Sequence, residues 1–175
     1  MTQTKEEDFN RDKLKIWVDA DATPRDVITI VSKAGSRCEV RVLFVSNHHI
    51  TLPLNNPYVR SIPVGSGENL ADDYIVDHVD KGDLVITADI PLAARVVDQE
   101  VFVISPRGEE YNKENVGERL SIRDFMHDLR STGIQTSGPK PYGSRDKKLF
   151  AETLDRLLTK ALSVDPHAPL KDNKI

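Results

Sequence analysis

The feature that most constrains this chain is a regular alternation of short apolar runs with segments of helical periodicity. Five runs are typical of β-strands, at residues 14–18, 39–46, 59–64, 83–87 and 101–104. Strands and helices that alternate at this spacing predict βαβ units, whose crossovers are right-handed. We therefore expect an α/β fold with a mainly parallel central sheet and helices on both of its faces.

Helices are expected over residues 24–34, 68–79, 91–98, 113–131 and 144–162. The first should begin with Thr23 as N-cap and Pro24 in the first turn, and Gly35 should end it. Beyond Gly108 the pattern becomes purely helical, which predicts a C-terminal helical extension. The last helix has an apolar stripe that includes Phe150 and Leu154. That stripe is expected either to join the core or to form a partner surface, so homodimerisation is left open.

The 175 residues suffice for one domain with a real core. We expect a single domain over residues 13–162, flanked by disordered tails at 1–12 and 163–175. No apolar run approaches the length of a membrane span, and the N-terminus lacks the apolar segment of a secretory signal. The single cysteine, Cys38, cannot form an internal disulfide. These features predict a cytoplasmic protein with no membrane contact.

The net charge of −4 argues against a general nucleic-acid coat, which needs an overall excess of Lys and Arg. The charge is unevenly distributed, because seven Lys or Arg stand against three Asp between Arg119 and Lys148. A local basic surface and an ordinary set of solvated helix charges explain this stretch about equally well.

Polar residues follow the predicted strands at the points where ligands bind in open parallel sheets. Asp19 and Asp21 follow the first strand, Asn47 the second, and Asp89 the fourth, while Arg107 comes after the fifth. Carboxylates gathered at one edge repel each other unless a cation or a shared proton relieves them. The pattern therefore predicts an acidic, metal-binding pocket.

Asp72 adds a fourth acid from a helix. At about 100° per residue, Ile75, Val76 and Val79 all lie within about 60° of Asp72, so its carboxylate falls in the middle of an apolar stripe. A carboxylate at such a position is costly unless it is paired, hydrogen-bonded or bound to a metal. An all-oxygen ligand set favours Mg²⁺ or Mn²⁺.

Each acid also has a purely structural interpretation. Asp89 can serve as the N-cap of the helix that begins near Pro91, and Asp72 can pair with Arg95 or Arg107. The acids are more convincing as a group than singly.

One function consistent with these residues is a phosphatase. The segment from Val18 to Thr23 matches the DxDxT motif of haloacid-dehalogenase-type phosphatases, in which the first Asp is the nucleophile and the second the general acid/base. However, the late acidic motif of that family follows an apolar strand, whereas Asp83 precedes one here. The phosphatase stays as the alternative hypothesis.

Long segments across about residues 14–160 resemble the YaiI/YqxD family of uncharacterised bacterial proteins. The strings that carry the resemblance are KIWVDADATP, ADDYIV, GDLVITADIPLAARV, PRGEEY, RLSIRDFMHDLRSTGIQTSGP and SRDKKLFAETLD. The resemblance implies a PIN-like, three-layer α/β/α domain. Nuclease members of the PIN-like group bind Mg²⁺ or Mn²⁺ through strand-edge acids and hydrolyse RNA. The family commonly has Cys where this chain has Thr23, which argues against a thiol-dependent mechanism.

The resulting hypothesis is a metal-dependent nuclease acting on RNA. Asp19, Asp72 and Asp89 are the expected metal ligands, with Asp21 as a further catalytic acid. Candidates for holding the substrate are Asn47, Arg107, Arg123 and Arg145. A PIN-like domain that binds RNA or a protein partner without catalysis is the non-enzymatic alternative.

Overall fold

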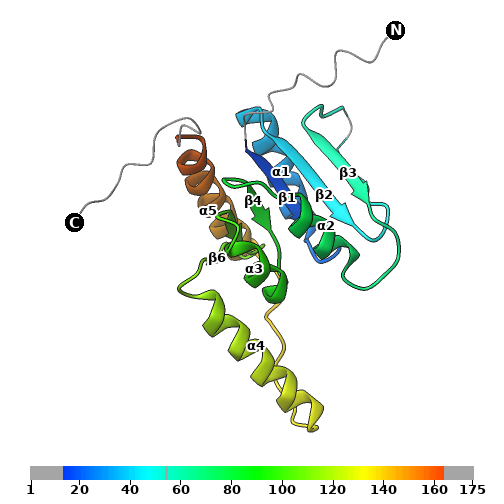
Figure 1. Cartoon of the computed structure of the whole chain (residues 1–175), viewed down its shortest axis with the longest axis vertical. Coiled ribbons are helices and arrows are strands. Elements are labelled where there is room, and N and C mark those ends of the chain that lie inside the picture. Colours follow the sequence, from blue (N-terminus) through cyan, green and yellow to red (C-terminus); the bar gives the residue numbers. More distant parts are fainter. Residues whose placement is uncertain (1–13, 54, 164–175) are drawn as a thin grey trace, which may run out of the picture.

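The computed structural model describes residues 14–53 and 55–163 and shows an α/β fold built on one six-stranded sheet (Figure 1). The predicted tails at 1–12 and 163–175 lie outside these residues, except for Ser163, which is the last residue of the final helix. The elements in chain order are β1 (Lys15–Asp19), α1 (Arg25–Cys38), β2 (Arg41–Ser46), β3 (Val59–Pro63), α2 (Leu70–His78), β4 (Leu84–Ile86), α3 (Ile90–Val97), β5 (Phe102–Ile104), β6 (Glu110–Tyr111), α4 (Val116–Ser131) and α5 (Ser144–Ser163).

The sheet has the strand order β3-β2-β1-β4-β5-β6, and all its pairings are parallel except β5 with β6. The predicted parallel α/β architecture is therefore confirmed. The chain builds outward from β1 through β2 to β3, returns through α2, and then builds through β4 and β5 on the other side. The sheet order thus reverses between β1 and β4, which is where open α/β sheets bind ligands.

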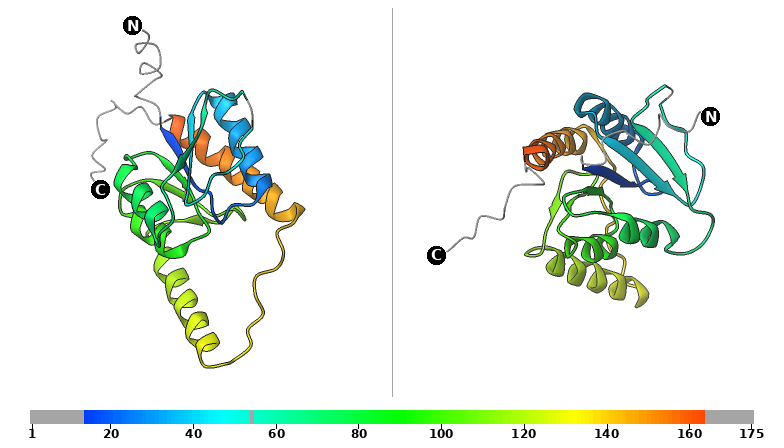
Figure 2. Two further views of the ribbon diagram at one scale, coloured as in Figure 1. Left: turned by 90° about the vertical axis from the view of Figure 1, so that its right-hand side faces the viewer. Right: turned by 45° about the horizontal axis from the view of Figure 1, so that its top comes forward.

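Helices cover both faces of the sheet (Figure 2). Alternate residues of the central strands point to opposite faces, so Ile16 and Val18 join a core with α1 and α5, whereas Trp17 and Val85 join a second core with α2 and α3. The apolar stripe of α5, including Phe150 and Leu154, is buried in the first core. The last helix is therefore part of the domain core rather than a partner surface.

The first helix differs from its prediction at both ends. It begins at Arg25 after Pro24 and has no side-chain cap, because the Thr23 hydroxyl donates to the Asp19 carbonyl instead. It continues through Gly35 to Cys38 and ends with Glu39 in the left-handed conformation. A Cβ at Gly35 would lie 2.5 Å from Cγ2 of Val42. Gly35 is thus explained by close packing on β2 and not by a helix end.

Strand β6 was not predicted. It has only two residues and pairs antiparallel with β5, so it carries too little periodicity to be recognised in the sequence.

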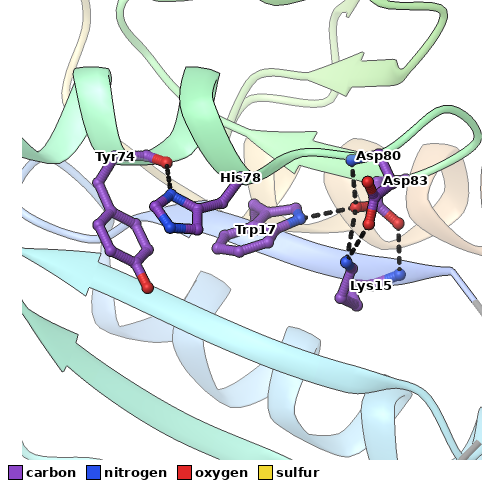
Figure 3. Close-up of polar contacts among 6 residues, drawn as sticks. All are labelled: Lys15, Trp17, Tyr74, His78, Asp80 and Asp83. Atoms are coloured by element: carbon purple, nitrogen blue, oxygen red, sulfur yellow. Dashed lines mark hydrogen bonds and ion pairs between the residues drawn. The ribbon is translucent and has the colours of Figure 1, made fainter. Parts of the chain in front are cut away.

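Asp83 fastens the amino end of β4 to β1 (Figure 3). Its carboxylate is buried and accepts hydrogen bonds from Lys15 N at 2.8 Å, Trp17 Nε1 at 2.8 Å and Asp80 N at 2.9 Å. The Lys15 ammonium lies 3.7 Å away and balances its charge. Every oxygen of this buried group is therefore satisfied, which makes its burial tolerable.

Replacing Asp83 with Ala should lower the free energy of unfolding by about 2 to 4 kcal/mol, because three donors lose their acceptor, and one of them, Trp17 Nε1, is buried. Urea titration followed by the fluorescence of Trp17, the only tryptophan, measures the effect. Asp80→Ala is the matched control. It removes an exposed carboxylate that also pairs with Lys15, and it should cost less than about 1 kcal/mol. Equal losses for the two variants would contradict this account of Asp83.

Candidate functional site

The carboxyl edge of the sheet brings together acids that are far apart in the sequence. Asp19 is the last residue of β1, and Asp89 follows the adjacent strand β4. Asp72 comes from the first turn of α2, which packs over β1 and β2. Electrostatic interactions join Asp19 to Asp89, Asp19 to Asp21, and Asp72 to both Asp19 and Asp89. The four acids thus form one interacting group, which we call the acid cluster.

Asp19 is buried, with 6% of its surface exposed. Burial raises the pKa of its carboxyl, a hydrogen bond from Thr87 opposes that change, and the charges of Asp89 and Asp21 raise the pKa further. The carboxylate form of Asp19 is therefore destabilised in the free protein.

Asp72 is half-buried and faces the same group. Burial, the charges of Asp89 and Asp19, and a hydrogen bond with Asp89 raise its pKa to about 6, against a weaker lowering by Arg95. Arg95 itself donates to Asp73 at 2.8 Å, so it does not neutralise Asp72 directly. Arg107, the other predicted partner of Asp72, pairs with Asp146 instead.

Asp89 is the N-cap of α3, as one interpretation of the sequence predicted, and it also belongs to the acid cluster. Its Oδ1 caps α3 by accepting from Leu92 N at 3.3 Å. Its carboxyl also lies within hydrogen-bonding reach of Asp72. The two interpretations of Asp89 are therefore compatible.

Thr87 is a site residue that the sequence reasoning missed. Its hydroxyl is fully buried, donates to Asp19 Oδ2 at 2.9 Å and accepts from Asp89 N at 2.9 Å. Because the oxygen accepts from Asp89, its proton is directed at Asp19. A hydroxyl at the end of a buried apolar strand needs a polar partner, and that requirement was the available signal.

Asp21 is exposed and orders the neighbouring loop. Its Oδ2 accepts from Asn47 N at 2.8 Å, which links the end of β1 to the end of β2. The side-chain Oδ1 of Asn47 is buried and has no hydrogen-bond partner among the described residues. The edge thus combines buried carboxylates with one that faces solvent.

Two of the three predicted arginines are bound to other partners. Arg107 is occupied by Asp146 and by the Lys140 carbonyl, and Arg123 pairs with Asp124 on the exposed surface of α4. Arg145 is exposed at the start of α5 and has no ion pair within the described ranges. Within the described part of the chain, Arg145 is therefore the one of the three whose charge is not paired.

As the side chains lie, no three His, Cys, Asp or Glu among residues 14–53 and 55–163 are spaced to hold one metal ion. None of the described helices is long and apolar enough to cross a membrane.

Residues 17–160 match the sequence profile of the uncharacterised bacterial YaiI/YqxD family, in agreement with the resemblance noted above. A UPF0178 protein of Myxococcus xanthus is 48% identical over 153 residues, which cover 87% of this chain and 99% of the relative. Another from Pseudoalteromonas atlantica is 52% identical over 145 residues, covering 83% of this chain and 98% of the relative. No solved structure was found to match.

The raised pKa of Asp72 predicts a specific dependence of stability on pH. The folded protein binds this proton more tightly than the unfolded chain, so the contribution of Asp72 to stability falls as the pH rises from about 4 to about 6. Asp72→Asn removes the charge, and its amide still donates to Asp89. At pH 7 we expect this variant to be more stable than wild type by about 1 kcal/mol, after allowance for solvent screening.

Urea titrations at a series of pH values test this, and the difference from wild type should shrink towards pH 4. Asp73→Asn, which changes an exposed acid paired with Arg95, is the control and should give no such gain. A gain for Asp72→Asn that does not depend on pH would refute the electrostatic explanation.

Proposed function

The chain belongs to the YaiI/YqxD family, and from this premise we propose that it is a divalent-metal-dependent nuclease that hydrolyses RNA phosphodiester bonds at the acid cluster. The observation that carries the proposal is the convergence of Asp19, Asp72 and Asp89, none of which forms an ion pair with a basic side chain among the described residues. The implied kinship with PIN-like nucleases supports the choice of reaction and of RNA as substrate.

Three buried or half-buried carboxylates destabilise one another, and two kinds of positive charge can relieve them. In the free protein a proton on Asp72, whose carboxyl hydrogen-bonds with Asp89, gives partial relief. A divalent cation would give more, and its binding requires these two side chains to exchange their mutual hydrogen bond for contacts with the ion. Metal binding should therefore release protons at about pH 6 and below, where at least half of the Asp72 carboxyls are protonated in the free protein.

The donor set fits Mg²⁺ or Mn²⁺, since every candidate ligand is a carboxylate oxygen. Asp19, Asp72 and Asp89 would hold the ion. When bound, the ion would lower the pKa of a coordinated water molecule, and its positive charge would stabilise the scissile phosphate.

The other residues of the edge position groups and transfer protons. Thr87 holds Asp19 in one orientation through its donated hydrogen bond. Asp21, which is exposed, would accept a proton from the attacking water or support a second ion. Arg145 is the favoured phosphate-binding residue, because the charges of Arg107 and Arg123 are already compensated. Asn47, held beside Asp21, is the remaining candidate for substrate contact.

The phosphatase alternative receives less support from the geometry. A nucleophilic carboxylate must be ionised and accessible, whereas Asp19 is buried and its pKa is raised. Asp83 lies at the amino end of β4, opposite the acid cluster, and is occupied by the Lys15, Trp17 and Asp80 donors.

We expect the wild-type protein to shorten a single-stranded RNA oligomer only when Mn²⁺ or Mg²⁺ is present. Asp19→Asn and Asp89→Asn should each lower the rate by roughly 10²-fold or more, the usual effect of removing a charge that stabilises the transition state. Asp73→Asn is the matched control on the outer face of α2 and should cleave like wild type. Isothermal titration with Mn²⁺ measures the metal affinity of each variant independently of cleavage.

Three results would count against the proposal. Activity unchanged in both variants would identify a contaminating nuclease. Release of phosphate from small monoesters, with an acid-labile phosphate on Asp19, would establish the phosphatase instead. If the protein binds RNA but neither cleaves it nor binds Mn²⁺, the non-catalytic alternative is established.

Thr87 provides a separate prediction about positioning. Thr87→Val keeps the shape of the side chain but removes the hydroxyl that orients Asp19, and it should weaken Mn²⁺ binding by about 10- to 100-fold. Thr87→Ser retains the hydroxyl and should restore most of that affinity. Equal Mn²⁺ affinities for the Val and Ser variants, measured by titration on folded protein, would show that the hydroxyl does not position the site.

A further inference from the structure

A pocket beside α1 lies apart from the acid cluster. Its volume is about 470 Å³, within the range of small-molecule sites, about 300–1,000 Å³. Five of its lining residues come from α1, and Pro53 and Asn56 come from the loop between β2 and β3. Because α1 and α2 cover opposite faces of the sheet (Figure 2), this pocket and Asp72 lie on opposite faces.

The hydroxyl of Ser32 is the group at this pocket that the fold leaves unsatisfied. Ser32 has only 2% of its surface exposed, and its Oγ forms no hydrogen bond with any described residue. Buried hydroxyls normally have a partner, and a helical serine can find one in the carbonyl four residues earlier. The neighbouring hydroxyls do so, since Thr29 donates to the Arg25 carbonyl at 3.2 Å and Ser36 to the Ser32 carbonyl at 3.3 Å. Of these three hydroxyls, that of Ser32 remains available to a ligand.

Asn56 lines the pocket in a fixed orientation. Its Oδ1 accepts from Tyr58 N at 3.1 Å, and its Nδ2 donates to the Ser32 carbonyl at 3.1 Å. A side-chain amide has two N–H donors, so one remains after this bond. Ser32 and Asn56 thus offer two neutral donors whose positions are set before a ligand binds.

Both charged residues that line the pocket are basic. Lys33 is exposed and forms no ion pair with any residue among 14–53 and 55–163. Arg37 pairs with Asp155 of α5, but these side chains are 61% and 57% exposed, and surface pairs of this kind are weak. Arg37 also has N–H donors beyond the one that Asp155 accepts. The charges therefore favour an anionic ligand.

The groups suit a phosphate better than a carboxylate. A phosphomonoester carries about −1.5 to −2 charges at neutral pH and has three strong acceptor oxygens. Two cations and two neutral donors match that demand, whereas a carboxylate has one charge and two oxygens. A phosphate alone is much smaller than the pocket, and Pro53 adds an apolar wall beside the donors. An organic group attached to the phosphate would occupy the remaining space.

We propose that this pocket binds a small organic phosphate, whose phosphate group contacts Lys33, Arg37 and the Ser32 hydroxyl. The organic part packs on Pro53 and accepts a hydrogen bond from Asn56. The proposal does not depend on the nuclease activity, because the pocket and the acid cluster share no residue.

Isothermal titration of the full chain with AMP, ribose 5-phosphate and inorganic phosphate tests the proposal. The buffer is freed of divalent metal, so that the acid cluster repels phosphate instead of holding it through an ion. At least one of the two organic phosphates should bind with a Kd of about 1 mM or tighter. Its counterpart without phosphate, adenosine or ribose, should bind at least about tenfold more weakly, because the charge-assisted hydrogen bonds are lost.

Two variants locate the binding. Lys33→Ala and Ser32→Ala should each weaken the organic phosphate by about tenfold or more, since each removes a donor to the phosphate. Lys113→Ala is the matched control, because it removes another exposed lysine that has no ion pair among the described residues. Ser32→Ala should unfold in urea at the same concentration as wild type or a higher one, since it removes a buried hydroxyl without a partner. A purely structural serine would lower that concentration.

Four outcomes would overturn the proposal. They are an affinity for both organic phosphates weaker than about 10 mM, equal binding with and without the phosphate group, unchanged binding in both variants, and loss of binding in Lys113→Ala. Inorganic phosphate that binds as tightly as AMP and ribose 5-phosphate would overturn the assignment to an organic phosphate.

Discussion

The pairing of β1 with β4 is the constraint on which the rest of this structure depends. Strand β4 has only three residues, yet it lies at the centre of the sheet, where the strand order reverses. Polar contacts fasten it at both ends. Asp83 binds the Lys15 and Trp17 donors at the amino end, and Thr87 binds the Asp19 carboxylate at the carboxyl end. These contacts fix the register of a strand too short to fix it by ladder hydrogen bonds alone, and so they fix where Asp19 and Asp89 lie.

A buried carboxylate lies at each end of the β1–β4 pairing, and the two carboxylates are compensated to different degrees. Asp83 receives three N–H donors and a nearby ammonium, so it is fully compensated. Asp19 accepts one hydrogen bond, from the Thr87 hydroxyl, and interacts with three further acids. Arg95, whose charge lowers the pKa of Asp72, forms its ion pair with Asp73 on the outer surface instead. Conflicts of this kind persist in proteins mainly at functional sites, where a ligand relieves them.

Much of the fold and part of the site could be predicted because they depend on local patterns. Strand ends mark the carboxyl edge, so Asp19 and Asp89 were expected to be neighbours, and Asp72 was recognisable as a charge within an apolar stripe. Contacts between distant segments could not be predicted. Gly35 is required by the approach of Val42, and Thr87 gains its role only from the β1–β4 pairing.

Arg107 shows why residue type at a strand end is a weaker guide for cations than for acids. It follows β5 at the predicted edge, but its long side chain reaches Asp146 and the Lys140 carbonyl and lies over the Tyr142 ring, 5.7 Å from its centre. The Tyr142 hydroxyl in turn donates to the Pro106 carbonyl at 2.9 Å. An arginine can satisfy its charge several residues away, whereas a short Asp side chain remains where the strand ends.

These contacts also position the segment that returns from α4 to α5. The Lys140 carbonyl and Asp146 both bind Arg107, so this segment is held beside the end of β5, at the carboxyl edge of the sheet. At the other end, Val116 of α4 is buried and the helix packs on α3. Residues 116–143 are therefore fixed at both ends, and the contacts that withdraw Arg107 from phosphate binding also set the position of α4 relative to the sheet.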